Sequence, residues 1–256
     1  YEYMNFVLND PNNGYYGSGR ATLGSKGDFV TSPSMSNDFA FLLSKQIDEW
    51  LIQLKSKSIC GDKLSVIEFG AGDGSLMSGL LEYFFIKNKK ILKNVSFIII
   101  EPNKGMIKKQ QKKLEKYLKL GFDILWKSLE EFEDRSLNGI VLANEVLDAL
   151  PVERVINLKG KMHRQGVSID KESGRLFFEE ITITKELEKS IAFAKEKLDI
   201  NIPPKDAPEG WTTEWHIDNK KWLKAIYTKI NNGILLIICL LYTSPSPRDL
   251  STSRMP

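Results

Sequence analysis

The alternation of apolar and polar stretches predicts that the middle of the chain folds as strands interleaved with helices. The strand candidates are short apolar runs at residues 64–69, 95–100, 122–126, 139–144 and 234–238. The helix candidates, in which apolar residues recur every three or four positions, are residues 75–86, 104–118 and 218–230. This order predicts right-handed crossovers and a parallel sheet, which binds its ligands beyond the carboxyl ends of its strands.

The segment before the first strand has a different pattern. A short helix is predicted to end at Asn9 or Asp10, and residues 36–54 carry apolar side chains along one helical face. Between these helices lies a glycine-rich stretch, too rich in breakers for regular structure, that keeps Tyr15 and Tyr16. Disordered linkers seldom retain aromatic residues, so we favour an ordered loop near the ligand site over a flexible connection.

After the fourth strand the pattern changes again. Residues 152–158 and 175–183 alternate like antiparallel strands, with Gly160 and Gly174 in the turns, and residues 185–198 have helical spacing. The proline-rich stretch that follows predicts irregular structure. We therefore expect a β-rich insertion or lid here.

These patterns divide the chain into segments. They are an N-terminal helical and loop segment (1–62), a ligand-binding core (63–151), the insertion (152–213), and a helix and fifth strand that complete the core (214–238). The last stretch, 239–256, has no periodicity and is rich in Ser, Pro and Thr. It resembles a translated sequencing adapter more than a disordered tail, so we predict that it is not native and that the domain is truncated there.

Composition is that of a soluble globular protein with one large domain or two small ones. The 36 basic and 33 acidic residues give a net charge of +3, which does not indicate a nucleic-acid or membrane partner. The longest apolar stretch, 234–241, is too short to span a bilayer. Cys60 and Cys239 are too few for a disulfide framework, and His163 and His216 lie in separate regions, so we expect no metal centre.

The clearest chemical signal follows the first strand, in the sequence VIEFGAGDGSL. Gly70 lets the chain turn sharply out of the strand, and Gly72 and Gly74 remove side chains where a ligand must approach the backbone. Ser75 is predicted to cap the next helix and to leave its positive N-terminus facing the ligand. An ordinary glycine turn between a core strand and a helix would share these features.

Two carboxylates favour a ligand site. Glu68 precedes the turn, and Glu101 ends the second strand, where an acidic residue binds ribose hydroxyls. Dinucleotide dehydrogenases share such a turn, but the GxGxG spacing departs from their GxGxxG fingerprint, and Glu68 suits the cationic amino-acid end of S-adenosylmethionine. We therefore predict S-adenosylmethionine as the cofactor. The predicted cofactor-binding residues are Glu68, Gly70, Ala71, Gly72, Gly74, Ser75, Glu101 and Asn144.

Four blocks in a fixed order carry a family resemblance: YMNFVLNDPNNGYYGSG, GSKGDFVTSPS, VIEFGAGDGSL and ANEVLDALPV. Over residues 2–238 the chain resembles the MidA-like class I methyltransferases, the complex I assembly type that methylates a protein arginine. The resemblance implies a Rossmann-like α/β sheet of seven strands with helices on both faces. Two departures are Ser34 or Met35, where the family usually has Glu, and Cys239, where it usually continues into Asp-Tyr-Gly.

The resemblance also implies a function. The chain would be a protein-arginine N-methyltransferase that acts on a subunit of NADH:ubiquinone oxidoreductase (complex I), in the mitochondrial matrix or the bacterial cytoplasm. Its implied partner is that protein substrate, with no nucleic acid and no membrane insertion. The alternative is a non-catalytic assembly factor that uses the same fold to hold its partner, and a dehydrogenase is a weaker third hypothesis.

Methyl transfer needs a positioned nucleophile more than a strong base. Glu145 and Asp148, just past the fourth strand, can grip a guanidinium, and with Asn144 they are the catalytic candidates. The alternatives are helix-start capping for the two acids and satisfaction of a strand-end carbonyl for Asn144. By the resemblance, the early loop closes over the cofactor or acceptor, although its residues also suit ordinary turns. These loop residues are Gly27, Asp28, Thr31, Ser32 and Pro33.

Two further features have plain explanations. Trp126, at the end of the third strand, could border an adenine but fits a core position as well. The lysine-rich helix at 104–118 is most simply a solvated face.

Overall fold

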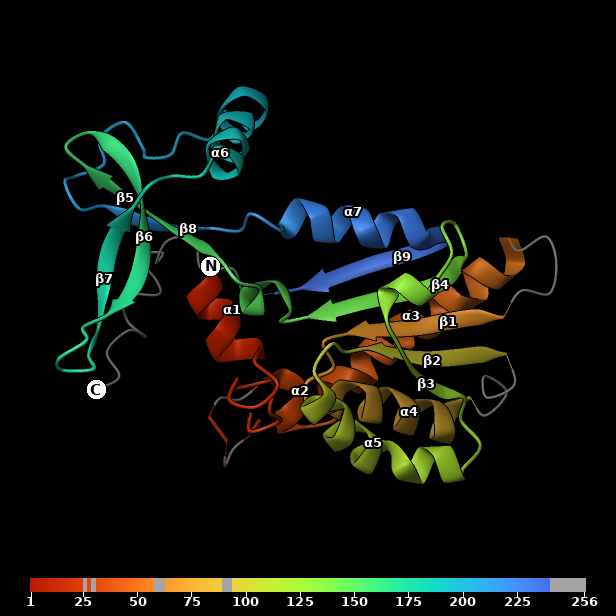
Figure 1. Cartoon of the computed structure of the whole chain (residues 1–256). Helices are drawn as coiled ribbons and strands as arrows, with labels where there is room; N and C mark the ends of the chain where they lie inside the picture. The colour runs from red at the N-terminus through yellow and green to blue at the C-terminus, as the bar shows by residue number, and fades with distance from the viewer. Residues whose placement is uncertain (25–26, 29–30, 58–62, 89–93, 240–256) are drawn as a thin grey trace.

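A computed structural model describes residues 1–24, 27–28, 31–57, 63–88 and 94–239, and Figure 1 shows its architecture. The core is a five-stranded sheet in the order β3-β2-β1-β4-β9, and every neighbouring pair is parallel. The strands are β1 (Leu64–Phe69), β2 (Val95–Ile100), β3 (Ile124–Lys127), β4 (Leu137–Asn144) and β9 (Ile230–Ile238). The predicted parallel α/β sheet is therefore confirmed.

Helices cover both faces of this sheet, as the sequence predicts. Side chains of α3 (Asp38–Lys57), α4 (Ser75–Lys87) and α5 (Lys104–Lys119) pack on one face, in a cluster that includes Val66 and Phe97. On the other face α7 (Asn219–Lys229) contributes Ile226 and Trp222. Because alternate residues of one strand point to opposite faces, strands buried on both sides need the nearly continuous apolar runs seen in β1 and β2.

The fifth strand begins earlier than predicted. Strand β9 starts at Ile230 rather than Ile234, because the polar residues before Ile234 pair with the beginning of β4. The side-chain amide of Asn231 donates to Asn138 Oδ1 at 3.0 Å across this pair. Polar residues can extend a strand at the end of a sheet, where water reaches their side chains.

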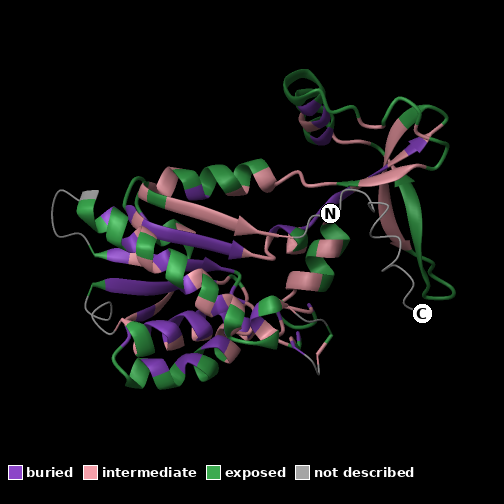
Figure 2. Ribbon diagram, turned by 180° about the vertical axis from the view of Figure 1, so that it is seen from behind, coloured by how far each residue is buried: buried purple, intermediate pink, exposed green. Residues whose placement is uncertain are grey.

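A second sheet stands apart from the core, beyond the carboxyl ends of its strands (Figure 1). Its order is β7-β6-β5-β8, all antiparallel, and α6 (Lys185–Leu198) packs on it. The strands are β5 (Glu153–Leu158), β6 (Lys161–Ile169), β7 (Leu176–Ile181) and β8 (Thr212–Trp215). Figure 2 shows that this sheet is far less buried than the core strands.

Two of these four strands are absent from the sequence-based prediction. Strand β6 has no buried residue and mixes polar and apolar side chains on both faces, so its pattern carries no clear period of two. Strand β8 has four residues and forms the end of the stretch 202–215 that was predicted to be irregular, so the prediction is wrong there. The antiparallel pairing of the insertion and its helix are as expected.

The N-terminal segment lies across the carboxyl edge of the core sheet. Helix α1 (Glu2–Asn9) reaches from the core to the second sheet in Figure 1. At one end the hydroxyl of Tyr1 donates to Asp218 Oδ2 at 2.5 Å, and at the other Asn103 Nδ2 donates to Asn9 Oδ1 at 3.5 Å. Short helical turns complete the chain: α2 (Ser32–Met35), η2 (Leu129–Glu131) and η3 (Leu147–Ala149). The sequence pattern does not predict α2 or η2 as helices.

Among the helices of the described ranges, none has both the length and the apolar character that crossing a membrane requires. Of the predicted non-native tail, only Cys239 belongs to the described residues, and positions 240–256 lie outside them. The division into segments stays a prediction.

Helices α3 and α4 approach so closely at Gly79 that a side chain there has no room. A Cβ atom at Gly79 would lie 2.4 Å from Cβ of Ala40. We therefore expect Gly79→Ala to lower the free energy of unfolding by about 1–3 kcal/mol, although alanine is the better helix former. Urea unfolding followed by circular dichroism measures this change.

The matched control is the exchanged pair. Ala40→Gly alone should lower the free energy of unfolding by about 1 kcal/mol, because glycine is a poorer helix former than alanine. When Ala40→Gly is combined with Gly79→Ala, the methyl group removed at position 40 leaves room for the one added at position 79. The double variant should lose less than the sum of the two single variants. Simple additivity would contradict a steric clash between these two residues.

Candidate functional site

The turn between β1 and α4 has the backbone shape that its glycines predict. Gly70, Gly72 and Gly74 all have positive φ, at 56°, 53° and 85°, a region that side chains other than glycine rarely enter. The N–H of Gly70 donates to Ile100 O at 3.0 Å, which ties the turn to the end of β2. A Cβ atom at Gly72 would lie 2.8 Å from Cδ1 of Leu23, so the N-terminal loop closes directly over the turn.

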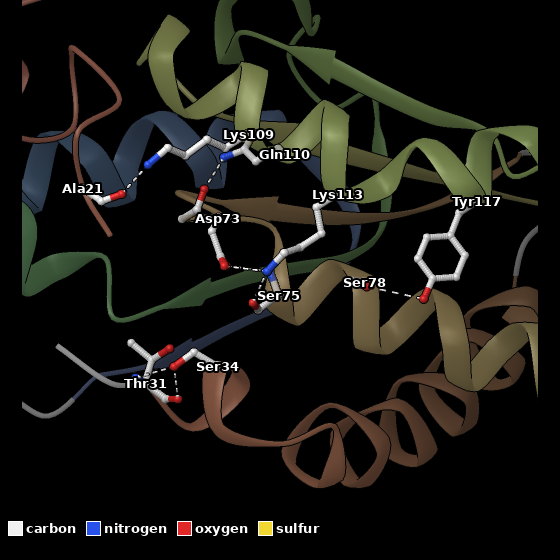
Figure 3. A network of polar contacts seen from close by, with 11 residues as sticks. Ala21, Thr31, Ser34, Asp73, Ser75, Ser78, Lys109, Gln110, Lys113 and Tyr117 are labelled. Atoms are coloured by element: carbon white, nitrogen blue, oxygen red, sulfur yellow. Dashed lines mark hydrogen bonds and ion pairs between the residues drawn. The ribbon is translucent and has the colours of Figure 1, made fainter. Parts of the chain in front are cut away.

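The cap of α4 differs from the prediction. Gly74 is the N-cap residue in left-handed conformation, and Ser75 is already the first helical residue, so it does not cap the helix. Asp73 takes over part of this role, because its Oδ1 accepts the N–H of Ser75 at 3.0 Å. Its Oδ2 pairs with Lys113 at 2.5 Å, and Lys113 also reaches Ser75 Oγ at 2.7 Å (Figure 3).

Glu68 is the most unusual ionisable group of the site. Its side chain is buried at the end of β1, it faces the backbone of Met77, and Oε2 has no hydrogen-bond partner among the described residues. Burial, together with the nearby negative charges of Asp73 and Glu101, raises the pKa of this carboxyl to about 8. A buried carboxyl without a partner is expected where a cationic or hydrogen-bonding ligand group completes the site.

Glu101 lies where the sequence predicts, at the end of β2. Its Oε1 accepts the backbone N–H of Asn103 at 3.0 Å, and its Oε2 accepts Gln110 Nε2 at 3.1 Å. Burial raises the pKa of Glu101, and these two hydrogen bonds oppose the rise. The carboxylate is thus held in a fixed orientation at the edge of the glycine turn.

Gln110 joins the parts of this site, and the sequence analysis missed it. Its Nε2 also donates to Gly72 O at 2.9 Å, and its Oε1 accepts the indole N–H of Trp126 at 3.0 Å. The residue is fully buried on α5, in a stripe with Met106 and Leu114. A lone glutamine in the apolar stripe of a helix is the signal that could have revealed it. Trp126 therefore serves the core and this network.

The lysine-rich helix α5 is only partly a solvated face. Lys109 Nζ donates to Ala21 O at 2.5 Å, Lys113 binds Asp73, and Lys116 pairs with Glu82 at 3.1 Å. These three lysines fix the N-terminal loop and α4 to α5, as Figure 3 shows for the first two. The remaining lysines of the helix's outer side are exposed, as predicted.

The N-terminal loop is ordered by its own contacts. The hydroxyl of Tyr15 donates to Asp28 Oδ2 at 2.6 Å, and Asp28 also accepts the N–H of Thr22 at 3.4 Å. Gly19 touches Gly105 at the start of α5 so closely that a Cβ atom at Gly105 would lie 2.3 Å from the Gly19 nitrogen. An ordered loop over the carboxyl edge is what the sequence predicts.

The predicted loop residues mainly stabilise the loop itself. Thr31 is the N-cap of α2 and forms a capping box with Ser34, in which Ser34 Oγ accepts the N–H of Thr31 at 2.9 Å. Ser32 and Pro33 lie in the first turn of α2, and Pro33 is buried. A Cβ atom at Gly27 would lie 2.1 Å from Thr22 O, which explains the glycine. Their contact with a ligand stays a prediction.

The three catalytic candidates, which are predicted to hold the methyl acceptor, lie at the end of β4. Asn144 is the last residue of the strand, opposite Ile238. Glu145 follows with a positive φ of 51°, and its N–H donates to Ile238 O at 2.7 Å. Asp148 lies exposed on η3, where neither it nor Glu145 caps a helix.

Cys239 belongs to the same corner, which the sequence analysis missed. Its Sγ donates to Asp148 Oδ1 at 3.6 Å. One carboxylate oxygen of Glu145, one of Asp148 and the sulfur of Cys239 all lie within 4.8 Å of one another. Burial and the two neighbouring carboxylates raise the pKa of this thiol to about 11, so it is protonated at neutral pH. The corner can therefore present two acidic groups and one neutral thiol to a cationic acceptor.

Tyr16 connects the two halves of the site. Burial raises the pKa of its phenol, and the charges of Asp148 and Glu101 contribute to the rise. Its ring packs edge-on against Tyr15, with ring centroids 4.9 Å apart. The loop thus places an aromatic side chain near both the acid at the end of β2 and the acid after β4.

Comparisons with known proteins point in one direction. Residues 42–248 match the family described as "Putative S-adenosyl-L-methionine-dependent methyltransferase". The chain is 31% identical to protein arginine methyltransferase NDUFAF7 of Xenopus tropicalis over 189 residues, 66% of this chain and 42% of that protein. It is 32% identical to the Homo sapiens protein of the same name over 174 residues, 60% of this chain and 37% of that protein.

A solved structure has the same fold. The crystal structure of a protein from Burkholderia thailandensis, described as a "likely methyl transferase" and bound to S-adenosyl-homocysteine, matches with a TM-score of 0.73 and 26% identity. The match covers 92% of this chain and 56% of that protein. The chain thus spans about two fifths of the length of the curated relatives above and just over half of this solved one.

The raised pKa of Glu68 has a consequence for stability. The unfolded chain ionises this carboxyl near pH 4.5, whereas the folded protein holds its proton up to about pH 8. Between these values the folded state binds more protons, so its stability falls as the pH rises. We expect Glu68→Gln to remove this pH dependence. Between pH 4.5 and 8 the free energy of unfolding of the variant should therefore rise relative to that of the wild type by on the order of a few kcal/mol.

Urea unfolding of both proteins without ligand, from pH 5 to pH 9, measures this difference. Glu115→Gln, an exposed glutamate of α5 that pairs with Lys119, is the matched control and should leave the pH profile unchanged. A constant offset between Glu68→Gln and the wild type across this range would contradict a buried carboxyl with a raised pKa.

Proposed function

The chain belongs to this family of S-adenosyl-L-methionine-dependent methyltransferases, and on that premise we propose that it methylates an arginine side chain of a protein. The observation that carries the proposal is the convergence of Glu68 and Glu101 on the glycine turn at the ends of β1 and β2. The relatives named protein arginine methyltransferases supply the acceptor class. The acceptor protein would be a subunit of complex I, acted on in mitochondria or in a bacterial cytoplasm.

The residues of the turn fit the cofactor. Glu101 is oriented by two hydrogen bonds and offers its carboxylate to the two ribose hydroxyls. The unpartnered Oε2 of Glu68 offers a buried negative charge to the amino-acid end, which would lower its pKa toward the usual value. Gly70, Gly72 and Gly74 keep side chains away from the bound molecule. When bound, S-adenosylmethionine supplies an electrophilic methyl group on a sulfonium.

The acceptor would be held at the end of β4. Glu145 and Asp148 can bind one guanidinium through charge-assisted hydrogen bonds, which would draw its positive charge away from the attacking nitrogen. The backbone hydrogen bond from the N–H of Glu145 to Ile238 O fixes the main chain that carries the first of these carboxylates. Asn144, at the end of β4, would orient the acceptor nitrogen.

Water must be excluded while the methyl group moves. The N-terminal loop is suited to this task, because Leu23 lies over Gly72 and Tyr16 lies near both Glu101 and Asp148. The close contact between Gly19 and Gly105 holds this loop against the start of α5. The proton released from the guanidinium can pass to Asp148, which is exposed and in contact with solvent.

Loss of the Glu101 charge should weaken cofactor binding. We expect Glu101→Gln to reduce the affinity for S-adenosylmethionine by about 10- to 100-fold, since a hydrogen bond to a charged group contributes about 1.5–3 kcal/mol. Isothermal titration calorimetry measures this affinity, and Glu115→Gln on the outside of α5 serves as control. If the wild type bound NADH and not S-adenosylmethionine, the proposed cofactor would be wrong.

Loss of Asp148 should affect turnover and leave cofactor binding intact. We expect Asp148→Asn to slow methylation by about 10²-fold or more, with an unchanged dissociation constant for S-adenosylmethionine. Mass spectrometry of arginine methylation on the acceptor subunit measures the rate. Glu130→Gln on η2, far from the end of β4, is the control.

The same assay addresses the alternative of a non-catalytic assembly factor. A protein that supports complex assembly equally well as wild type and as Glu101→Gln, with no methylated arginine in either case, would contradict the proposed reaction.

A further inference from the structure

The second sheet ends in an edge strand that contains no proline, no lysine and no bulge. On its outer side β7 pairs with no other strand in the part of the chain that the structure describes. Natural edge strands are blunted by Pro, by Lys or by a bulge, yet β7 reads LFFEEI and pairs with β6 in unbroken register. Its apolar residues are largely exposed: Leu176 by 56%, Phe177 by 48% and Phe178 by 59%. Figure 2 shows this strand exposed at the far end of the molecule from the core.

The hairpin determines which backbone groups point outward. The N–H of Asp170 donates to Arg175 O at 2.8 Å, so Arg175 directs its backbone groups toward β6. Because this direction alternates along an antiparallel strand, Phe177 and Glu179 also face β6, while Leu176 and Phe178 direct their N–H and C=O groups outward. An added strand must therefore bond to Leu176 and Phe178.

The side chains of β7 divide between two faces. Arg175, Phe177 and Glu179 lie on the face that bears Val155, which packs on α6. Leu176 and Phe178 lie on the opposite face beside Ile169 and Val167, their partners across the ladder. The guanidinium of Arg154 covers the Phe178 ring at 5.0 Å from its centroid, which holds this ring against the sheet.

The sequence of β7 is complementary to itself in one register. When two copies of the strand run antiparallel about a two-fold axis through Phe177, Phe177 faces Phe177 of the other copy and Leu176 faces Phe178. Arg175 then faces Glu179 on the same side of the sheet, twice per pair. The outward backbone groups of Leu176 and Phe178 form the ladder bonds. Shifting the axis to Phe178 would place Glu179 against Phe177, and shifting it to Glu179 would bring two like charges together.

We propose that β7 pairs with β7 of a second copy of this chain, so that two insertions form one continuous eight-stranded sheet. Such an interface is isologous and closes on itself. Both charged side chains can pair with the second copy. Among the described residues no carboxylate lies within ion-pair distance of Arg175. Glu179 accepts a hydrogen bond from Ser168 with one oxygen, and its other oxygen can bind the arginine of the second copy. An unrelated extended peptide could use the same edge, but nothing in it would supply both the aromatic centre and the paired charges.

Sedimentation equilibrium of the full chain tests the proposal. We expect a reversible dimer at tens of micromolar protein. Arg175→Glu and Glu179→Arg should each weaken the dimer by about tenfold, since each change creates two like-charge pairs. The double variant exchanges the two charges and should restore the wild-type dissociation constant within about threefold. Glu196→Arg, an exposed change on α6 of the same insertion, is the control.

Cross-linking tests the register. Phe177→Cys places two thiols opposite each other at the axis, at a Cβ separation of about 5 Å, and should form a disulfide-linked dimer on mild oxidation. Leu176→Cys, one residue away and equally exposed, should cross-link much less. Thermal melts confirm that each variant is folded.

Each outcome bears on the proposal. A monomeric wild type, or a dimer that neither charge reversal weakens, would overturn pairing through β7. Weakening by both single variants without rescue in the double variant would overturn this register, as would equal cross-linking at positions 176 and 177. Since none of these residues belongs to the glycine turn or the end of β4, cofactor binding by the same variants reports separately on the proposed methyl transfer.

Discussion

Two carboxylates at neighbouring strand ends, one buried and one half-buried, are the constraint on which the rest of the structure depends. Glu68 and Glu101 lie where burial opposes their ionisation, and the charge of Glu101 also raises the pKa of Glu68. Such groups persist only if the surroundings supply hydrogen bonds, and here the backbone at Met77 and Asn103 and the amide of Gln110 do so. The glycine turn, α5 and β3 are connected through that single amide, so the position of the ligand site and the packing of the core are set together.

The cover of the site follows from the same arrangement. Helix α5 begins right after Glu101, and its first turn accepts the N-terminal loop at Gly105, while Lys109 binds the carbonyl of Ala21. A loop with many glycines is thereby given fixed anchors on a rigid helix. This explains how a segment without regular structure keeps its aromatic residues in place over the sheet.

Much of the core could be predicted from the sequence, because its strands are buried on both faces and leave a strong apolar signal. The positions of Glu68, Glu101 and Asn144 at strand ends follow from that signal and from parallel topology. Other features were not predicted. Strand β6 has no buried side chains, the helix cap passed from Ser75 to Asp73 through the left-handed Gly74, and Gln110 gave only one polar position in an apolar stripe. Cys239 lies near Asp148 only because β9, which it follows, pairs with β4.

The hydrogen bond from Glu145 to Ile238 spans residues that are 93 positions apart (238 − 145). A bond of this kind cannot form until both of its ends exist. On the ribosome, the turn at Glu68 and the acid at Glu101 therefore have their neighbours β1, β2 and β3 available long before β9 emerges. The part of the site around Glu68 and Glu101 can therefore form first, and the part around Glu145 is fixed last.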